Sequence, residues 1–313
     1  MNLPEMTVPA VNTFEHIYEK AAEKAANASP GRAALMLPSD SHTLKAFHRA
    51  AEEKLIAPTI IGNREAFDAS CAAENLKFDN VNFIEAGNFD GVVAKGAELA
   101  AAGEIDLLVN GAIPVADMLG RLFKADTDFI REKKTVSHIA LLKPERYKKL
   151  LFLTDSAVVV QPDLATKLKL IDNIVELAGK TGIDKPRIAL LAAVEVIYPQ
   201  MPVTMEAAVI AKMAERRQIK GAFVDGPLSF DIAVDMFAAH AKGVTGSEVA
   251  GQADALIAPN IEVANGIYKG LSLYGKCRLG GVIVGGRVPI ALGSRSDNAE
   301  NKYNSLVLGV LAG

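Results

Sequence analysis

Short apolar runs alternate with longer amphipathic segments along most of the chain. The runs lack polar alternation, which is typical of strands buried on both faces of a parallel sheet. The segments between them have the length and periodicity of helices. The pattern predicts strands at residues 33–38, 59–62, 81–84, 105–109, 187–192, 221–224 and 255–257, and helices at 13–28, 42–54, 64–73, 91–102, 115–123, 204–216, 229–239 and 263–271. This alternation predicts an α/β fold with largely parallel sheets covered by helices.

The clearest single helix lies near the middle of the chain. Apolar residues recur there at helical spacing, at Leu164, Leu168, Ile171, Ile174 and Ala178. Asp163, directly before them, is a favourable N-cap, and Gly179 and Gly182 mark the end. These local signals predict a helix that begins after Asp163.

The alternation stops in the polar stretch at residues 124–134 and then restarts. Residues 137–142 and 150–155 predict paired strands, joined by the polar segment 143–149, which has the composition of a surface connection. We expect a first domain made of residues 1–142 and 285–313, because the segment around Ser294 must return to face the ligand site. Residues 143–284 are expected to form the second domain.

Composition narrows the class of protein. Half of the 313 residues are hydrophobic, which is enough to bury one or two cores. The 34 basic and 37 acidic residues are well mixed, so nucleic acid is not an indicated partner. No apolar run approaches the roughly 18 residues of a membrane-spanning helix. The two cysteines, Cys71 and Cys277, are isolated and the N-terminus lacks a signal-peptide pattern, so we expect a cytoplasmic protein.

The last fifth of the chain holds the strongest candidate for chemistry. An apolar run enters glycines at residues 280–286, and Ser294-Arg295-Ser296-Asp297 follows with hydroxyls, a cation and a carboxylate within one turn. An arginine keeps its proton and offers a fork that fits phosphate oxygens. Arg287 is a second cation nearby. The alternative is a helix start, with Ser294 or Ser296 as the N-cap and Arg295 solvated.

A second candidate follows the predicted strand at residues 221–224. Asp225-Gly226-Pro227 opens a segment that carries Asp231 and Asp235, and ligands of open α/β sheets bind at the carboxyl ends of strands. The alternative is that Ser229 caps a helix and Asp231 interacts with its positive end. No histidine or cysteine accompanies the aspartates, so we expect no metal site. Nucleotide-binding glycine motifs and the G-x-S-x-G serine motif are absent from the sequence.

A series of different short motifs occurs in a fixed order along nearly the whole chain. They lie at residues 153–156, 162–167, 185–195, 225–231, 251–259, 265–269, 281 and 289–302. In this order they resemble the phosphate acetyltransferase and phosphate butyryltransferase family. The resemblance implies two α/β/α domains with a cleft between them, as in isocitrate and isopropylmalate dehydrogenases, and a homodimer built on the second domain.

The same resemblance implies the reaction of acyl-CoA with phosphate to give acyl phosphate and CoA, with no bound cofactor or metal. Acyl-CoA, or coenzyme A itself, and inorganic phosphate are then the expected partners. By similarity, Ser294 hydrogen-bonds the reacting carbonyl or thiol, Arg295 binds phosphate and Asp297 is the nearest candidate base. The expected substrate-binding residues are Arg131, Arg287, Asn265, Lys269, Asp225, Gly226 and Pro227.

Three positions depart from the family's pattern and leave alternatives open. Asn110 stands where the butyryltransferase branch has lysine, Ala264 where glycine is usual, and Asn301 where the acetyltransferase branch has its aspartate base. The predicted function is phosphate acyltransferase with a short-chain acyl-CoA, most specifically phosphate acetyltransferase. The alternatives are phosphate butyryltransferase, a catalytically weakened CoA-binding regulatory protein, and a metal-dependent dehydrogenase on the related two-domain fold.

Overall fold

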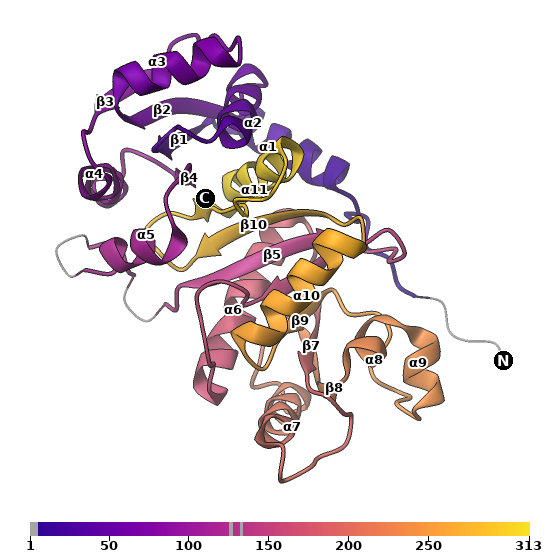
Figure 1. Ribbon diagram of the computed structural model, residues 1–313. Coiled ribbons are helices and arrows are strands. Elements are labelled where there is room, and N and C mark those ends of the chain that lie inside the picture. Colours follow the sequence, from indigo (N-terminus) through magenta and orange to yellow (C-terminus); the bar gives the residue numbers. More distant parts are fainter. Residues whose placement is uncertain (1–5, 125–127, 132–133) are drawn as a thin grey trace. The chain divides into compact units, whose positions relative to one another are not determined.

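The computed structural model describes residues 6–124, 128–131 and 134–313 (Figure 1). The chain divides into two compact units. Unit 1 contains Ser137–Arg278 with the segment that ends at Thr13, and unit 2 contains Phe14–Val136 with Leu279–Gly313. The expected first domain corresponds to unit 2 and the expected second domain to unit 1. The bounds differ at residues 137–142 and at the N-terminal segment, which lie in unit 1. Residues 137–143 pair with the next strand, and the backbone N–H of Thr7 donates to Gln252 Oε1 at 3.2 Å.

Unit 2 is built on strands in the order β3-β2-β1-β4-β11-β10. The strands are β1 (Gly31–Met36), β2 (Ile56–Gly62), β3 (Asn82–Glu85), β4 (Leu107–Asn110), β10 (Arg278–Val284) and β11 (Ile290–Ala291). The helices are α1 (Phe14–Asn27), α2 (Ser41–Glu52), α3 (Arg64–Ala73), α4 (Phe89–Ala101), α5 (Val115–Leu122) and α11 (Ala299–Ala312). Neighbouring strands run parallel except β10 and β11, so the carboxyl ends of β1, β4 and β11 lie at one edge.

Helix α11 forms the centre of unit 2. Its residues from Lys302 to Leu311 are all buried, and it packs against α1, α2, β4 and β11. Apolar or small side chains occupy most of its faces, which is typical of a helix enclosed by its own domain. Asn298 caps it by accepting the N–H of Asn301 at 2.9 Å. The alternative in which Ser294 or Ser296 caps this helix is therefore wrong.

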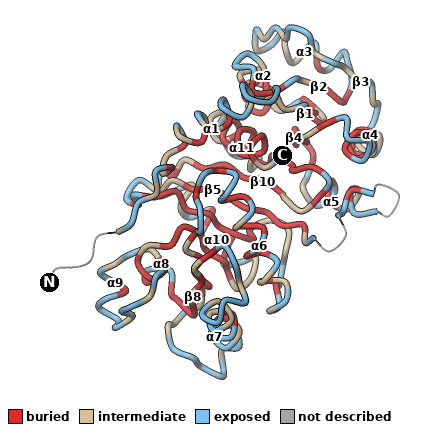
Figure 2. The backbone as a smooth tube through the Cα atoms, turned by 180° about the vertical axis from the view of Figure 1, so that it is seen from behind, coloured by how far each residue is buried: buried red, intermediate tan, exposed pale blue. Residues whose placement is uncertain are grey.

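Unit 1 has strands in the order β5-β6-β9-β7-β8, and most strand residues are buried (Figure 2). The strands are β5 (Ser137–Lys143), β6 (Leu151–Thr154), β7 (Arg187–Leu191), β8 (Phe223–Leu228) and β9 (Ala255–Ile257). The helices are α6 (Leu164–Thr181), α7 (Pro202–Glu215), α8 (Phe230–Val234), α9 (Met236–Ala241) and α10 (Ile261–Tyr274). Only the first pair of strands, β5 and β6, is antiparallel.

Two helix predictions in unit 1 had different outcomes. The prediction for α6 is confirmed, because Asp163 accepts the N–H of Thr166 at 2.8 Å and Gly182 ends the helix at φ 86°. The single helix predicted at 229–239 is wrong. The backbone of Asp235 is extended, at φ −128° and ψ 115°, and its carboxylate caps α9 by accepting the N–H of Ala238 at 2.9 Å. The segment therefore forms two short helices.

Segment 143–149 is only partly the surface connection that its polarity predicts. Lys149 is fully buried, its Nζ lies 2.5 Å from Asp254 Oδ1, and it donates to the carbonyl of Gln252 at 2.6 Å. The other carboxylate oxygen of Asp254 accepts the backbone N–H of Arg187 at 2.8 Å. Burial lowers the pKa of Lys149 even with Asp254 beside it. This ion pair ties the starts of β6, β7 and β9 together.

Candidate functional site

The Ser294–Asp297 segment is a closed turn between β11 and α11. The backbone N–H of Ser294 donates to Asp297 Oδ2 at 2.7 Å, and the N–H of Asp297 donates to the Ser294 carbonyl at 3.0 Å. Asp297 is buried at 4% exposure, whereas Arg295 and Ser296 are exposed. The Oγ atoms of Ser294 and Ser296 lie 3.1 Å apart. The turn therefore carries two neighbouring hydroxyls and, between them in the sequence, an exposed arginine.

A buried lysine lies against this turn. A β-carbon on Gly293 would lie 2.8 Å from Lys302 Cδ and 3.3 Å from Asp297 Oδ2, so any larger residue here would require the lysine side chain to shift. Lys302 Nζ lies 3.5 Å from Asp40 Oδ2, and Asp40 also caps α2 through the N–H of Thr43 at 3.0 Å. Although burial alone would raise it, the pKa of Asp40 is lowered by Thr43 and Lys302. A positive charge is thus enclosed next to the turn.

Arg131 and Arg287 are brought together in unit 2. Arg131 Nη2 donates to the Arg287 carbonyl at 2.9 Å, next to a bridge between Ile130 and Gly286. The Arg287 guanidinium donates to the Asp128 carbonyl at 2.9 Å and forms an ion pair with the Asp128 carboxylate. Its charge is therefore already balanced.

The two asparagines that depart from the family's pattern have local partners. Asn301 Oδ1 accepts the backbone N–H of Leu279 at 3.2 Å, which ties α11 to β10. Asn110 is buried at 7% exposure, and its Nδ2 donates to the Ile113 carbonyl at 2.9 Å. An amide is neither a base nor a cation. Positions 110 and 301 therefore supply neither function here.

In unit 1, Asp225, Gly226 and Pro227 lie near the end of β8. Asp225 Oδ1 accepts the N–H of Gly226 at 2.8 Å, and Asp225 Oδ2 accepts the hydroxyl of Ser247 at 2.5 Å. Ser247 Oγ in turn accepts the N–H of Val249 at 3.1 Å. These bonds attach the strand end to the glycine-rich loop at 243–251.

Asp231 also has partners within unit 1. Its carboxylate pairs with Lys242 Nζ at 2.8 Å and accepts the hydroxyl of Ser229 at 2.6 Å. Lys242, followed by Ser229, lowers the pKa of Asp231 to about 2. Ser229 occupies the N-cap position of α8 without a side-chain cap hydrogen bond. Among the described residues, no group of three His, Cys, Asp or Glu side chains is arranged to hold a metal ion.

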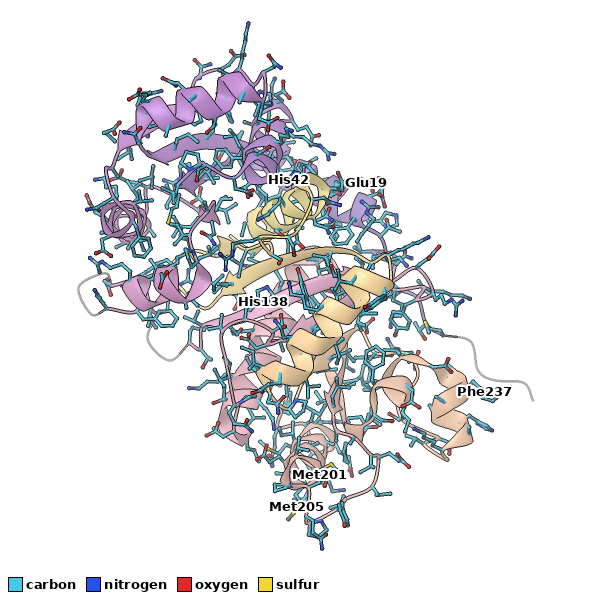
Figure 3. All side chains as sticks on the ribbon, viewed as in Figure 1. Glu19, His42, His138, Met201, Met205 and Phe237 are labelled. Atoms are coloured by element: carbon cyan, nitrogen blue, oxygen red, sulfur yellow. The ribbon has the colours of Figure 1, made fainter. Side chains whose placement is uncertain are left out.

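Asn265 and Lys269 lie one turn apart on α10. Asn265 Nδ2 donates to the carbonyl of Ser156 at 3.1 Å, and Ser156 Oγ lies 3.0 Å from Nδ1 of His138 on β5 (Figure 3). Burial lowers the pKa of His138 to about 4, so the ring is neutral near pH 7. The Tyr268 ring meets His138 edge-on at 6.4 Å between centroids. Sequence reasoning did not select His138; the available signal was a lone histidine within an apolar strand.

A cavity of about 530 Å³ lies on another part of unit 1. Leu191, Met201, Val203 and Val263 line it, together with an ion pair between the buried Lys167 and the half-buried Glu206. Asn265, Lys269 and Asp225–Pro227 are not among its lining residues. Exposed apolar side chains flank Met201 in sequence, at Val196, Ile197, Tyr198, Met205 and Val209 (Met201 and Met205 are labelled in Figure 3). The lining is thus mostly apolar, and Val263 places the cavity beside α10, the helix that also carries Asn265 and Lys269.

Comparison with known families identifies the chain. Residues 88–310 match the model of the phosphate acetyl/butaryl transferase family. The chain belongs to this family. Phosphate butyryltransferase from Clostridium acetobutylicum is 35% identical over 301 residues, which cover 96% of this chain and 98% of that protein. Phosphate acetyltransferase from Thermotoga maritima is 34% identical over 283 residues, which cover 89% and 94%.

Solved structures agree with the membership in the phosphate acetyl/butaryl transferase family. A branched-chain phosphotransacylase from Enterococcus faecalis V583 aligns with a TM-score of 0.77 at 29% identity, over 90% of this chain and 98% of that one. A phosphotransacetylase from Streptococcus pyogenes shares the fold, with a TM-score of 0.78 at 21% identity over 96% and 98%. The predicted family, the α/β fold class and the acyltransferase class are confirmed. The site residues, the homodimer and the cytoplasmic location stay predictions.

No helix in the described part of the chain is long and apolar enough to cross a membrane.

Proposed function

We propose that this protein transfers a short acyl group between coenzyme A and inorganic phosphate. A phosphate oxygen attacks the thioester carbonyl, a C–O bond forms, the C–S bond breaks, and the thiolate leaves and takes up a proton. The products are acyl phosphate and CoA. Family membership over residues 88–310 supports this reaction, and the related enzymes named above act on acetyl or butyryl groups. Acetyl-CoA is the first substrate to test and butyryl-CoA the second.

The Ser294–Asp297 turn is the observation that carries the proposal. Its backbone is fixed by two reciprocal hydrogen bonds, while Arg295 is exposed and makes no hydrogen bond or ion pair with any described residue. A guanidinium carried on such a turn can bind two phosphate oxygens at once. We assign Arg295 to phosphate, with Arg131 as a second anion ligand. Arg287 supports Arg131, because its own charge is balanced by Asp128.

Ser294 and Asp297 have different roles in this proposal. The Ser294 hydroxyl donates to the carbonyl oxygen as negative charge develops there. Asp297 is the proposed base that takes the CoA thiol proton in the reverse direction. A carboxylate has about four acceptor sites, so the bond from the Ser294 N–H does not exclude this role. The side chain of Asn301 is hydrogen-bonded to Leu279 and has no carboxylate to accept a proton, which favours Asp297 as the base.

In unit 1 we assign Asn265 and Lys269 to coenzyme A and give Asp225, Gly226 and Pro227 a shaping role. One carboxylate oxygen of Asp225 accepts the N–H of Gly226 and the other accepts the hydroxyl of Ser247. We further propose a cytoplasmic homodimer whose subunits meet through unit 1. The exposed apolar side chains at residues 196–198, 205 and 209 support this interface.

The second candidate function is a CoA-binding regulatory protein with weak turnover. The observation in its favour is Asn110, which is buried and neutral where the butyryltransferase branch has a lysine. Such a protein would bind CoA but release little thiol from acyl-CoA when phosphate is added.

One assay separates these functions. Thiol release is measured with acetyl-, propionyl- and butyryl-CoA, with and without phosphate, and in the presence of EDTA and no nicotinamide. We expect turnover that requires phosphate and is indifferent to EDTA. CoA binding without phosphate-dependent thiol release would favour the regulatory protein. Dependence on a divalent metal or a nicotinamide would favour the dehydrogenase.

A further inference from the structure

The carboxamide of Asn265 has a fixed orientation although the residue is exposed. Its Nδ2 lies 3.1 Å from the carbonyl oxygen of Ser156. A carbonyl can only accept, so the amide nitrogen and not the amide oxygen must face Ser156. Within the part of the chain that the structure describes, Asn265 Oδ1 accepts no hydrogen bond. The atom that Asn265 offers to a ligand is therefore an acceptor.

The Ser156 carbonyl is itself held in place from several directions. Ser156 and His138 are 5% and 4% exposed, and their side chains are hydrogen-bonded at 3.0 Å. Asp155 Oδ2 accepts the backbone N–H of His138 at 2.7 Å. Asp155 Oδ1 accepts the N–H groups of Ala157 at 2.8 Å and Val158 at 2.7 Å. The peptide that orients Asn265 is thus preorganised before any ligand arrives.

An acceptor distinguishes between the two substrates of the proposed reaction, on which this inference rests. Phosphate near neutral pH is an anion that presents acceptor oxygens, so Asn265 Oδ1 would repel most of its surface. Coenzyme A carries two secondary amide N–H groups in its pantetheine arm. These donors are present in both CoA and acyl-CoA, whereas the thiol proton is absent from the thioester.

The neighbouring residue on α10 suggests which part of CoA lies here. Lys269 is one turn from Asn265, and its ammonium lies 5.3 Å from the centroid of the Tyr268 ring. A cation at this position suits the diphosphate that adjoins the pantetheine arm. We propose that Asn265 Oδ1 accepts a hydrogen bond from a pantetheine amide N–H, and that Ser156 and His138 are positioning residues for this contact.

The first experiment measures CoA binding directly by calorimetry and compares Asn265→Ala with the unchanged protein. We expect Asn265→Ala to weaken CoA binding about tenfold, which corresponds to about 1.4 kcal/mol, with an unchanged KM for phosphate. Ser272→Ala is the matched control on the same helix and should leave both values unchanged. An unchanged CoA affinity in Asn265→Ala, or a higher KM for phosphate instead, would overturn the proposal.

The second experiment identifies the ligand atom. Two CoA analogues are used, each with one pantetheine amide replaced by an ester that lacks the N–H. One of them should bind the unchanged protein about tenfold more weakly than CoA, and Asn265→Ala should discriminate against it less than twofold. Equal losses of affinity in both proteins for both analogues would show that Asn265 does not contact a pantetheine amide N–H.

The positioning role has its own readout. Ser156→Ala should weaken CoA binding about threefold and reduce discrimination against the same ester analogue, while Ser156→Thr keeps a hydroxyl and should restore both. A fall in Tm with unchanged analogue discrimination would show that Ser156 and His138 only stabilise the fold. If the unchanged protein binds CoA with these preferences but shows no phosphate-dependent turnover, the proposed function fails while the Asn265 contact stands.

Discussion

The Ser294–Asp297 turn of unit 2 and the Asn265 contact of unit 1 use different kinds of interaction. The turn combines an exposed arginine with a buried carboxylate, and a buried lysine lies against it. The Asn265 contact uses a carboxamide, a carbonyl, a hydroxyl and a histidine ring that is neutral near pH 7. The first arrangement attracts an anion from many directions. The second accepts a donor from one direction only.

This difference matches the chemistry of the two proposed substrates. Phosphate is small, symmetric and charged, so a fork-shaped cation recognises it with little need for further detail. The pantetheine arm is long and uncharged, so it can be recognised only through directional hydrogen bonds and shape. The comparison suggests that charge selects phosphate in unit 2, while neutral groups in unit 1 recognise the pantetheine arm of CoA and Lys269 recognises its diphosphate. The following predictions test that division from the largest expected effect to the smallest.

The largest effect should come from the ion pair between Lys149 and Asp254 in unit 1, because both of its side chains are almost fully buried. Lys149→Met leaves Asp254 buried without its ammonium, and we expect the free energy of unfolding to fall by about 3–5 kcal/mol. Urea unfolding measures it. Lys302→Met is the counterpart in unit 2 and should cost less, because its partner Asp40 keeps 26% side-chain exposure. Equal losses would contradict the comparison.

Ser294→Ala should lower turnover about a hundredfold, or about 3 kcal/mol, with little change in the KM for phosphate. The reason is that the hydroxyl is proposed to act mainly as charge develops on the carbonyl. Steady-state kinetics measures both values. Ser296→Ala is the control, since its hydroxyl lies 3.1 Å from that of Ser294 and has no assigned role. Full turnover in Ser294→Ala would move the reaction centre elsewhere.

Lowering the pH should destabilise the folded protein through His138. The pKa of His138 is lowered from 6.5 to about 4, so between these values the unfolded chain binds a proton that the folded chain does not. The free energy of unfolding therefore keeps its full value well above pH 6.5 and falls as the pH is lowered from there towards 4. Between pH 6.5 and 5 the loss should be roughly 2 kcal/mol. Urea unfolding at both pH values should show this extra loss in the unchanged protein and not in His138→Asn.

Arg295→Lys should raise the KM for phosphate about tenfold, or about 1.4 kcal/mol, although the formal charge is kept. A lysine is a point charge and cannot bind two phosphate oxygens in parallel. Phosphate titrations at saturating acyl-CoA measure the change. Arg287→Lys should have a smaller effect, because Asp128 already balances its charge. An unchanged KM in Arg295→Lys would show that the turn does not bind phosphate.

Much of the fold was predictable because its signals are local. Asp163, the apolar stripe after it and Gly182 lie within one helix, and they gave α6 with the correct cap. Lys149 was not predictable, because the aspartate that makes its burial tolerable lies more than a hundred residues later. Polarity alone placed Lys149 at the surface. The single helix predicted at 229–239 was wrong for a related reason. The amphipathic pattern continues through Asp235, but its carboxylate caps a new helix there.

The candidate site shows the same limit. The Ser294-Arg295-Ser296-Asp297 motif and the family resemblance selected the turn, because the residues that shape it are adjacent in sequence. They also selected Asn265. They gave no role to His138, because its link to Asn265 passes through Ser156 on a different element. Sequence patterns therefore found the groups that face a ligand better than the groups that orient them.

The burial of α11 has a consequence for protein synthesis. Unit 2 needs residues 14–136 and 279–313, and the α11 side chains from Lys302 to Leu311 form part of its core. A ribosome must make residues 137–278 in between, which takes roughly 7–28 s at ~5–20 residues per second. Unit 1 can fold during that time, while the first part of unit 2 waits with an open core. A chaperone that binds nascent chains would accordingly be expected on residues 14–136, and phosphate binding would begin only after residues 279–313 have emerged.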